Sequence, residues 1–171
     1  YTGDDARVKL VLEQVSQKHR DPGTMRAIGF CASIAHAEFM ARRFTEAGLP
    51  SLAVSAETDS DTRKDALASL RTGRVRALFA VDLFNEGVDL PEVDTLLFLR
   101  PTESALVFLQ QLGRGLRRHE RKDCVTVLDF IGQSHRKFRF DLRYRAVTGT
   151  TRTEAEKPIQ SGLPFLPAGC S

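Results

Sequence analysis

Two arginines three residues apart, Arg114 and Arg117, are the side chains of this sequence best suited to bind a phosphate. Residues three apart on a helix share a face, and each guanidinium presents a planar fork of donors that matches phosphate oxygens. Gly113 and Gly115 flank the first arginine and allow a ligand to approach the backbone closely. An exposed basic turn near a helix end would have the same composition. The spacing by itself leaves the two interpretations equally open.

A second polar segment, residues 81–91, directly follows an apolar run. Asp82 comes after the last apolar residue of the run, and a turn containing Gly87 is followed by Asp89. A carboxylate on a tight loop at the end of a strand can accept hydrogen bonds from ribose hydroxyls or orient an arginine that faces it. The alternative is that Asp82 and Asn85 only cap a short helix.

The elements that must position these residues are five short apolar runs, which alternate with longer segments of helical period. Continuously apolar runs of this length are typical of strands covered by helices on both faces of a parallel sheet. The runs span residues 27–31, 52–55, 77–81, 95–99 and 124–130. They predict a three-layer, doubly wound α/β fold with a parallel sheet. In such sheets, ligands bind at the carboxyl ends of the strands.

The helical segments carry start and stop signals. Ser33 is expected to cap a helix that Gly48 ends, and Asp59 or Ser60 to open one that Gly73 ends. The core-facing residues predicted for these two helices are Ala37, Met40, Ala41, Phe44, Ala66, Leu67 and Leu70. Further helices are predicted over 5–18, 101–113 and 133–147, and we expect the first of them to dock on the sheet edge.

The length of 171 residues, 42% of them hydrophobic, suits one compact domain, expected over residues 1–149. Residues 150–171 contain three prolines and little periodicity, so we expect a linker or the start of a further region. The sequence does not begin with Met, has no signal-peptide pattern and has no apolar run of eighteen residues. These features predict a cytoplasmic fragment of a longer protein, without membrane contact.

The charge is unevenly distributed, and the cysteines and histidines show no metal-binding pattern. Residues 112–147 contain ten Lys and Arg against four Asp and Glu, which would suit a surface that contacts phosphates. Cys31, Cys124 and Cys170 lack C-x-x-C spacing, so we expect reduced thiols rather than a disulfide or a zinc site. The four histidines share no ligand spacing, and no metal site is predicted in this chain.

Taken together and in this order, the motifs resemble those of the C-terminal RecA-like lobe of superfamily-2 helicases. Gln110-x-x-Gly113-Arg114-x-x-Arg117 is similar to motif VI of that superfamily, Val81-Asp82-x-x-x-x-Gly87-x-Asp89 to motif V, and Phe30-Cys31-x-Ser33 to motif IV. The residues of two segments, 82–91 and 110–118, look closest to those of type III restriction-like bacterial helicases. Residues 165–170, Phe-Leu-Pro-Ala-Gly-Cys, resemble a segment found in those that carry a C-terminal domain of unknown function.

The resemblance implies a role for each matched residue. Arg114 and Arg117 would reach the γ-phosphate of ATP across the interface with another lobe. The residues that would line the nucleotide from this side are Gly87, Asp89, Gln110 and Gly113. Ser33, Val81 and Asp82 would contact the nucleic-acid backbone. Val81 departs from the pattern, because many relatives have a threonine hydroxyl at this position.

The sequence contains neither a G-x-x-x-x-G-K-[ST] phosphate loop nor an Asp-Glu pair after a strand. The resemblance therefore implies that ATP and Mg²⁺ are bound mainly by an N-terminal RecA-like lobe of the same polypeptide, and that this chain alone is inactive. We expect DNA rather than RNA as the nucleic-acid partner. One alternative is a degenerate module that binds nucleic acid or protein without ATPase activity. Another is a flavodoxin-like domain, which would need a Gly-rich turn where this chain has Cys31-Ala32-Ser33.

Overall fold

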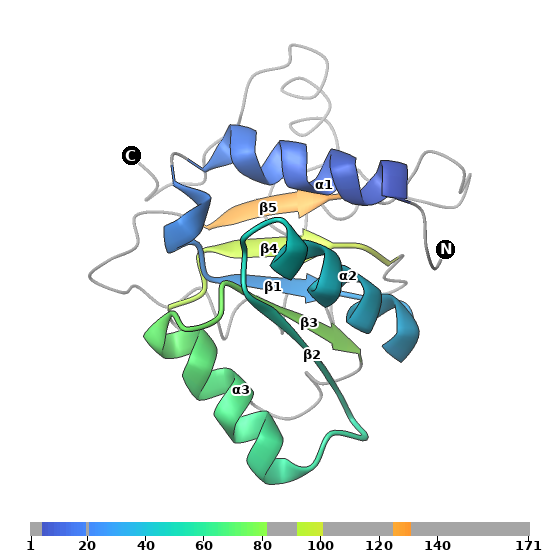
Figure 1. Ribbon diagram of the computed structural model, residues 1–171, viewed down its shortest axis with the longest axis vertical. Coiled ribbons are helices and arrows are strands. Elements are labelled where there is room, and N and C mark those ends of the chain that lie inside the picture. Colours follow the sequence, from blue (N-terminus) through green and yellow to red (C-terminus); the bar gives the residue numbers. More distant parts are fainter. Residues whose placement is uncertain (1–4, 20, 82–91, 101–124, 131–171) are drawn as a thin grey trace, which may run out of the picture. The chain divides into compact units, whose positions relative to one another are not determined.

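The computed structural model describes residues 5–19, 21–81, 92–100 and 125–130. Within these ranges the chain forms a parallel sheet with the strand order β2-β3-β1-β4-β5 (Figure 1). The strands are β1 Ala27–Phe30, β2 Ser51–Ser55, β3 Ala77–Val81, β4 Thr95–Phe98 and β5 Thr126–Asp129. All five predicted strands are confirmed, each within two residues of its predicted bounds.

The three central strands are buried along their whole length, as their continuously apolar sequences predict. β1 lies between β3 and β4, and Ala27 is in register with Ala77 on one side and with Thr95 on the other. All the pairings are parallel, so the carboxyl ends of the strands share one edge of the sheet. This edge is called the carboxyl edge below, and the opposite one the amino edge.

In the described part of the chain, three α-helices and one short 3-10 helix accompany the strands: α1 Asp5–Lys18, η1 Pro22–Thr24, α2 Ile34–Glu46 and α3 Ser60–Thr72. The predicted caps are confirmed, with Ser33 opening α2 and Asp59 opening α3. Gly48 and Gly73 follow the two helices with φ near +80°, which a residue without a side chain adopts readily. The predicted core residues are buried, except that Leu67 is half-buried. The helices predicted over 101–113 and 133–147 lie outside the described residues.

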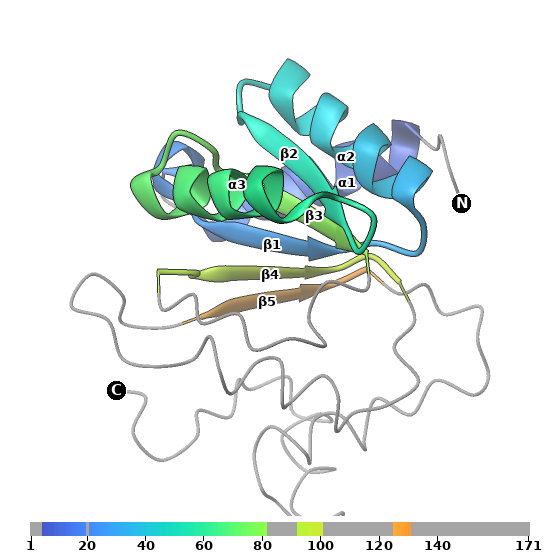
Figure 2. The same cartoon turned by 90° about the horizontal axis from the view of Figure 1, so that it is seen from below.

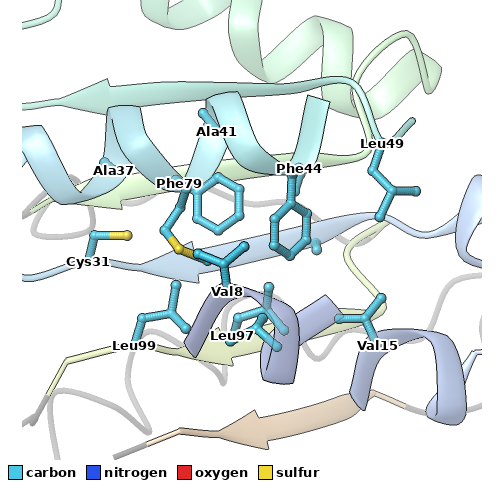
Figure 3. Packing of buried hydrophobic residues seen from close by; sticks show 14 of the residues in the cluster. Val8, Val15, Cys31, Ala37, Ala41, Phe44, Leu49, Phe79, Leu97 and Leu99 are labelled. Carbon is cyan, nitrogen blue, oxygen red and sulfur yellow. The ribbon is translucent and has the colours of Figure 1, made fainter. Parts of the chain in front are cut away.

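The main core lies between one face of the sheet and helices α1 and α2 (Figure 3). Phe44 of α2 and Phe79 of β3 meet edge to face, with ring centroids 4.9 Å apart. Gly29 makes room for this contact, because a Cβ there would lie 2.4 Å from the Phe79 ring. Val8, Val11 and Val15 of α1 belong to the same buried cluster.

Helix α1 therefore lies on a face of the sheet, and the prediction that it docks on the edge was wrong. Two polar contacts fix its position over β4 and β5. Arg7 donates a hydrogen bond to the carbonyl oxygen of Phe130, and the His19 ring lies 2.8 Å from the hydroxyl of Thr95. Its valines recur at a helical spacing, so they form an apolar stripe that is best buried against a face.

Helix α3 covers the opposite face, so the predicted three layers are confirmed (Figure 2). Its buried residues, Ala66 and Leu70, are not part of the cluster formed by α1 and α2. On this face, the rings of Phe30 and Phe98 stack with centroids 4.9 Å apart. None of the described helices is long and apolar enough to cross a membrane. The predicted domain boundary at residue 149 lies outside the described residues.

Candidate nucleotide and nucleic-acid interface

The structure describes two of the residues predicted to form a site, Ser33 and Val81. The other predicted residues lie outside the described ranges: Asp82, Gly87, Asp89, Gln110, Gly113, Arg114 and Arg117. Their roles stay predictions. The part of the interface that can be built from the described residues is therefore the carboxyl edge of the sheet, from which these segments leave.

Three neighbouring strands end close together at this edge. The N–H of Cys31, which follows β1, donates to the carbonyl oxygen of Ala80 in β3 at 2.9 Å. On the other side of β1, the N–H of Leu99 donates to the carbonyl oxygen of Phe30 at 3.1 Å. The segments that follow β1, β3 and β4 contain the three motifs, so all three leave the sheet from adjacent strand ends. This agrees with the prediction that the motifs follow strand ends at one edge of the sheet.

Ser33 is the N-cap of α2. Its backbone is extended, with φ −154° and ψ 162°, and its hydroxyl oxygen accepts a hydrogen bond from the N–H of His36 at 3.2 Å. The cap satisfies a helix N–H that would otherwise lack a partner. Ser33 is half-buried. The capping role is confirmed, and a hydroxyl oxygen with a second lone pair and its own proton is still able to contact a phosphate.

His36 holds the turn before α2 together, a role that the sequence interpretation missed. Its side chain is buried, and Nδ1 lies 3.4 Å from the N–H of Ala32, which donates to it. An accepting ring nitrogen carries no proton, so the imidazole is neutral with its proton on Nε2. Burial, reinforced by the nearby charge of Arg7, lowers the pKa of His36 below 6.5. The capping-box signal would not have found this contact, because that motif has Glu or Gln at the third helical position and bonds the N–H of the cap residue itself.

Val81 ends β3 with its side chain only 8% exposed, inside the same cluster as Cys31 and Leu99. Valine suits this position because its side chain packs in the core. A contact between residue 81 and nucleic acid would have to be made by the main chain. Because this chain has valine where many relatives have threonine, no side-chain hydroxyl can contact a phosphate here, but the end of β3 still packs in the core.

Cys31 is a buried, free thiol, as predicted. Burial raises its pKa to about 12, against a smaller opposing effect of the Arg100 charge. The thiol is thus protonated at neutral pH, and it does not have the depressed pKa of a nucleophilic cysteine. Cys124 and Cys170 lie outside the described residues. Within the described ranges, no group of histidine, cysteine and carboxylate side chains is arranged to hold a metal ion.

The turn after β2 is a further feature of the carboxyl edge that the sequence interpretation missed. Arg63 of α3 reaches back and donates to the carbonyl oxygens of Ala56 and Thr58, at 3.2 and 2.9 Å. A hollow of about 220 Å³ lies between this turn and the start of α2, and it is lined in part by Glu38 and Glu57. Two carboxylates would repel a phosphate, so this hollow is unsuited to nucleic acid.

Comparison with known proteins places these features in a family. The helicase conserved C-terminal domain matches residues 7–119. A putative ATP-dependent helicase, IRC3 of Saccharomyces cerevisiae, is 29% identical over 126 residues, which cover 74% of this chain and 18% of that protein. The UvrABC system protein B of Thermotoga neapolitana is 32% identical over 166 residues, covering 88% of this chain and 24% of that protein. The chain thus spans a quarter or less of these relatives.

Two solved structures illustrate the shared fold. The type ISP restriction-modification enzyme LlaBIII, bound to DNA, superposes with a TM-score of 0.60 at 21% identity, over 72% of this chain and 10% of that one. Domain 2 of the DEAD-box helicase Mss116p, bound to an RNA duplex, gives a TM-score of 0.56 at 18% identity, over 72% and 48%. At these identities the likeness establishes the fold.

Proposed function

The chain belongs to the helicase conserved C-terminal domain family, whose match covers residues 7–119, and on this premise we propose that it is the C-terminal motor lobe of an ATP-dependent superfamily-2 helicase or translocase. The membership confirms the resemblance that the motifs predicted. Because the chain spans only part of its relatives, the complete motor would need a second lobe.

The observation that supports this proposal best is the position of β1 between β3 and β4. Motif IV follows β1, motif V follows β3, and motif VI lies in the segment after β4. The segments that carry the three motifs therefore leave the sheet from three adjacent strands at one edge. This is the edge at which parallel α/β sheets bind their ligands.

We assign Arg114 and Arg117 to the γ-phosphate of ATP, which an N-terminal RecA-like lobe would hold together with Mg²⁺. The residues assigned to the nucleotide from this side are Gly87, Asp89, Gln110 and Gly113. When ATP is bound, the two lobes would close, and hydrolysis would allow them to open again. Arginine fingers of this kind accelerate nucleotide hydrolysis by roughly 10³- to 10⁵-fold.

The nucleic-acid contact is assigned to the turn of Ser33 and to the main chain at Val81 and Asp82. Ser33 stands at the N-terminus of α2, where the helix dipole favours an anion such as a backbone phosphate. The neutral imidazole of His36 keeps the turn in shape and adds no charge. We propose DNA rather than RNA as the nucleic acid, on the resemblance to restriction-like helicases.

The test is nucleic-acid-stimulated ATP turnover by the full-length protein. Arg114→Ala and Arg117→Ala are each expected to lower kcat at least tenfold, because each removes charge stabilisation of the transition state. Arg42→Ala is the matched control, since Arg42 is exposed on α2, about two turns from the start of that helix. Near-normal turnover in both motif variants would exclude the arginine-finger role.

The same assay separates the alternatives. Single-stranded DNA is expected to stimulate turnover more strongly than RNA of the same sequence, and the reverse order would contradict the preference for DNA. A full-length protein that binds nucleic acid without any ATP turnover would instead support the degenerate module.

A further inference from the structure

At the amino edge of the sheet, two arginines occupy matching positions on adjacent strands. Ala27 of β1 is in register with Ala77 of β3, so the preceding residues, Arg26 and Arg76, lie side by side. A backbone hydrogen bond of 2.8 Å from the N–H of Ala27, the residue after Arg26, to the carbonyl oxygen of Arg76 holds the two strands together at this point. Side chains at matching positions project from the same face of a sheet. Like charges placed this way repel each other.

The end of α3 leaves room for both guanidinium groups. Gly73 caps the helix with φ 79°. A Cβ at this glycine would lie 2.1 Å from Nη2 of Arg26 and 3.1 Å from Nη1 of Arg76. Atoms of both guanidinium groups therefore lie beside Gly73, close to the same position. Both arginines are half-buried, which reduces the screening of their charges by solvent.

The guanidinium of Arg26 is held in place by its own loop. Its Nη1 donates to the carbonyl oxygens of Thr24 and Met25, at 2.7 and 3.1 Å. The same group directs Nη2 towards Gly73. A cation fixed in this way loses little conformational entropy when an anion binds to it.

The surroundings of the pair are cationic. Arg71 lies in the last turn of α3, and Arg74 follows Gly73 on the surface. Two carboxylates lie nearby. Glu92 is 3.4 Å from Nε of Arg71, and Asp94 accepts the backbone N–H of Arg26 at 3.1 and 3.2 Å. Among the described residues, Arg71 and Arg74 thus add positive charge beside the pair at the amino edge, where the strands and the end of α3 meet (Figure 1).

We propose that Arg26 and Arg76, with Arg74 beside them, form a binding site for a phosphate group. Two neighbouring guanidinium groups supply several donors for the oxygens of a phosphate, and its negative charge offsets the repulsion between them. The site lies at the amino edge of the sheet, whereas Ser33 and Val81 lie at the carboxyl edge, so it is separate from the nucleic-acid contacts proposed for these two residues. The phosphate can belong to a small polyphosphate or to a nucleic-acid backbone.

Calorimetric titration of the 171-residue chain with sodium tripolyphosphate at low salt tests the site. Arg26→Gln and Arg76→Gln are each expected to weaken binding about tenfold, the effect of losing one charge-assisted contact. Arg42→Gln removes the same charge from the exposed face of α2 and is expected to leave the affinity within about twofold.

Two glycine variants distinguish a loss of phosphate binding from a loss of folding. Gly73→Ala and Gly48→Ala introduce the same left-handed strain, with φ values of +79° and +82°. Only Gly73→Ala places a methyl group where Arg26 lies, because a Cβ at Gly48 meets nothing within 4 Å. We expect Gly73→Ala to weaken tripolyphosphate binding about as much as Arg26→Gln does. Gly48→Ala should retain full affinity, with circular dichroism showing that both variants are folded.

A single-stranded oligonucleotide identifies the source of the phosphate. If its binding depends on Arg76 as that of tripolyphosphate does, the ligand is a backbone phosphate; if only tripolyphosphate shows this dependence, it is a small molecule. Unchanged affinity in both arginine variants, or equal weakening in Arg42→Gln, would overturn the site. Tighter binding of a polyglutamate peptide than of either phosphate ligand would also overturn it. Weakening confined to Arg114→Gln and Arg117→Gln would overturn it while supporting the proposed function.

Discussion

Helices α2 and α3 both begin at the carboxyl edge of the sheet, on opposite faces, but they present different charges there (Figures 1 and 2). α2 opens with the hydroxyl of Ser33 and has no acidic residue in its first turn. α3 opens with the carboxylate of Asp59, and Asp61 follows in its first turn. Both helices thus have an N-cap side chain whose oxygen accepts hydrogen bonds from helix N–H groups, but the cap is neutral at α2 and charged at α3.

The difference indicates which part of the edge can receive a phosphate. A helix N-terminus attracts anions through its partial positive charge. At α3 the Asp59 carboxylate already accepts from two N–H groups, at 3.1 and 2.9 Å, and Glu57 adds further negative charge. At α2, the cap and His36 are both uncharged, and the first carboxylate of the helix, Glu38, comes only in its second turn. We infer that a nucleic-acid backbone passes over the start of α2 and avoids the start of α3.

The largest expected effect is obtained by exchanging the two caps. Ser33→Asp preserves a good N-cap but places a negative charge at the proposed phosphate contact, so it should weaken nucleic-acid binding roughly tenfold at low salt. Asp59→Ser also preserves a cap and should leave the affinity unchanged or slightly tighter. Fluorescence anisotropy with a labelled single strand measures both. Equal changes of affinity in the two variants would show that nucleic acid does not distinguish the start of α2 from the start of α3.

A smaller effect is expected on stability. Ser33→Ala removes the cap of α2 and should lower the free energy of unfolding by about 1 kcal/mol, measured by urea denaturation. Asp59→Ala should also lower it, because two helix N–H groups lose their acceptor. Ser60→Ala is the control for α3, since Ser60 is exposed and follows the cap. Full stability of Ser33→Ala would mean that His36 and the rest of the turn are sufficient to start α2.

The smallest effect is a difference in pH dependence. The pKa of His36 is lowered from 6.5, mainly by burial. The unfolded chain therefore binds more protons below about pH 6.5, and the free energy of unfolding should fall as the pH decreases from there. The pKa of Asp59 is lowered from 3.8, mainly by its hydrogen bonds with Thr62. Its contribution is present above that pH and is lost only as the pH falls through the lowered pKa.

Urea denaturation at several pH values distinguishes the two groups. His36→Asn keeps a side-chain acceptor for Ala32 but cannot titrate, so it should reduce the loss of stability that begins near pH 6.5. Asp59→Asn should leave that loss unchanged and alter only the more acidic region. An unchanged profile for His36→Asn would show that another group is responsible.

Much of the fold was predictable because its signals are local. The strands are continuous apolar runs, and Ser33, Asp59, Gly48 and Gly73 mark helix ends by their own backbone preferences. The site was predictable only in part. The capping role of Ser33 was predictable because capping acts within one turn, whereas Arg63 bonds to carbonyl groups whose direction depends on the folded loop. The nucleotide and nucleic-acid roles of the motif residues stay predictions. The narrower assignment to helicases with a C-terminal domain of unknown function stays a prediction.

The sequence by itself determined the succession of the described strands and α-helices, their caps, and the motifs by which the family resemblance was recognised. Tertiary structure alone decided that β1 lies between β3 and β4, that α1 covers a face of the sheet, and that Arg26 lies beside Arg76. The physical reason is that strand order and register follow from burying both faces of the sheet at once. That condition joins residues far apart in the chain, and no local pattern encodes it.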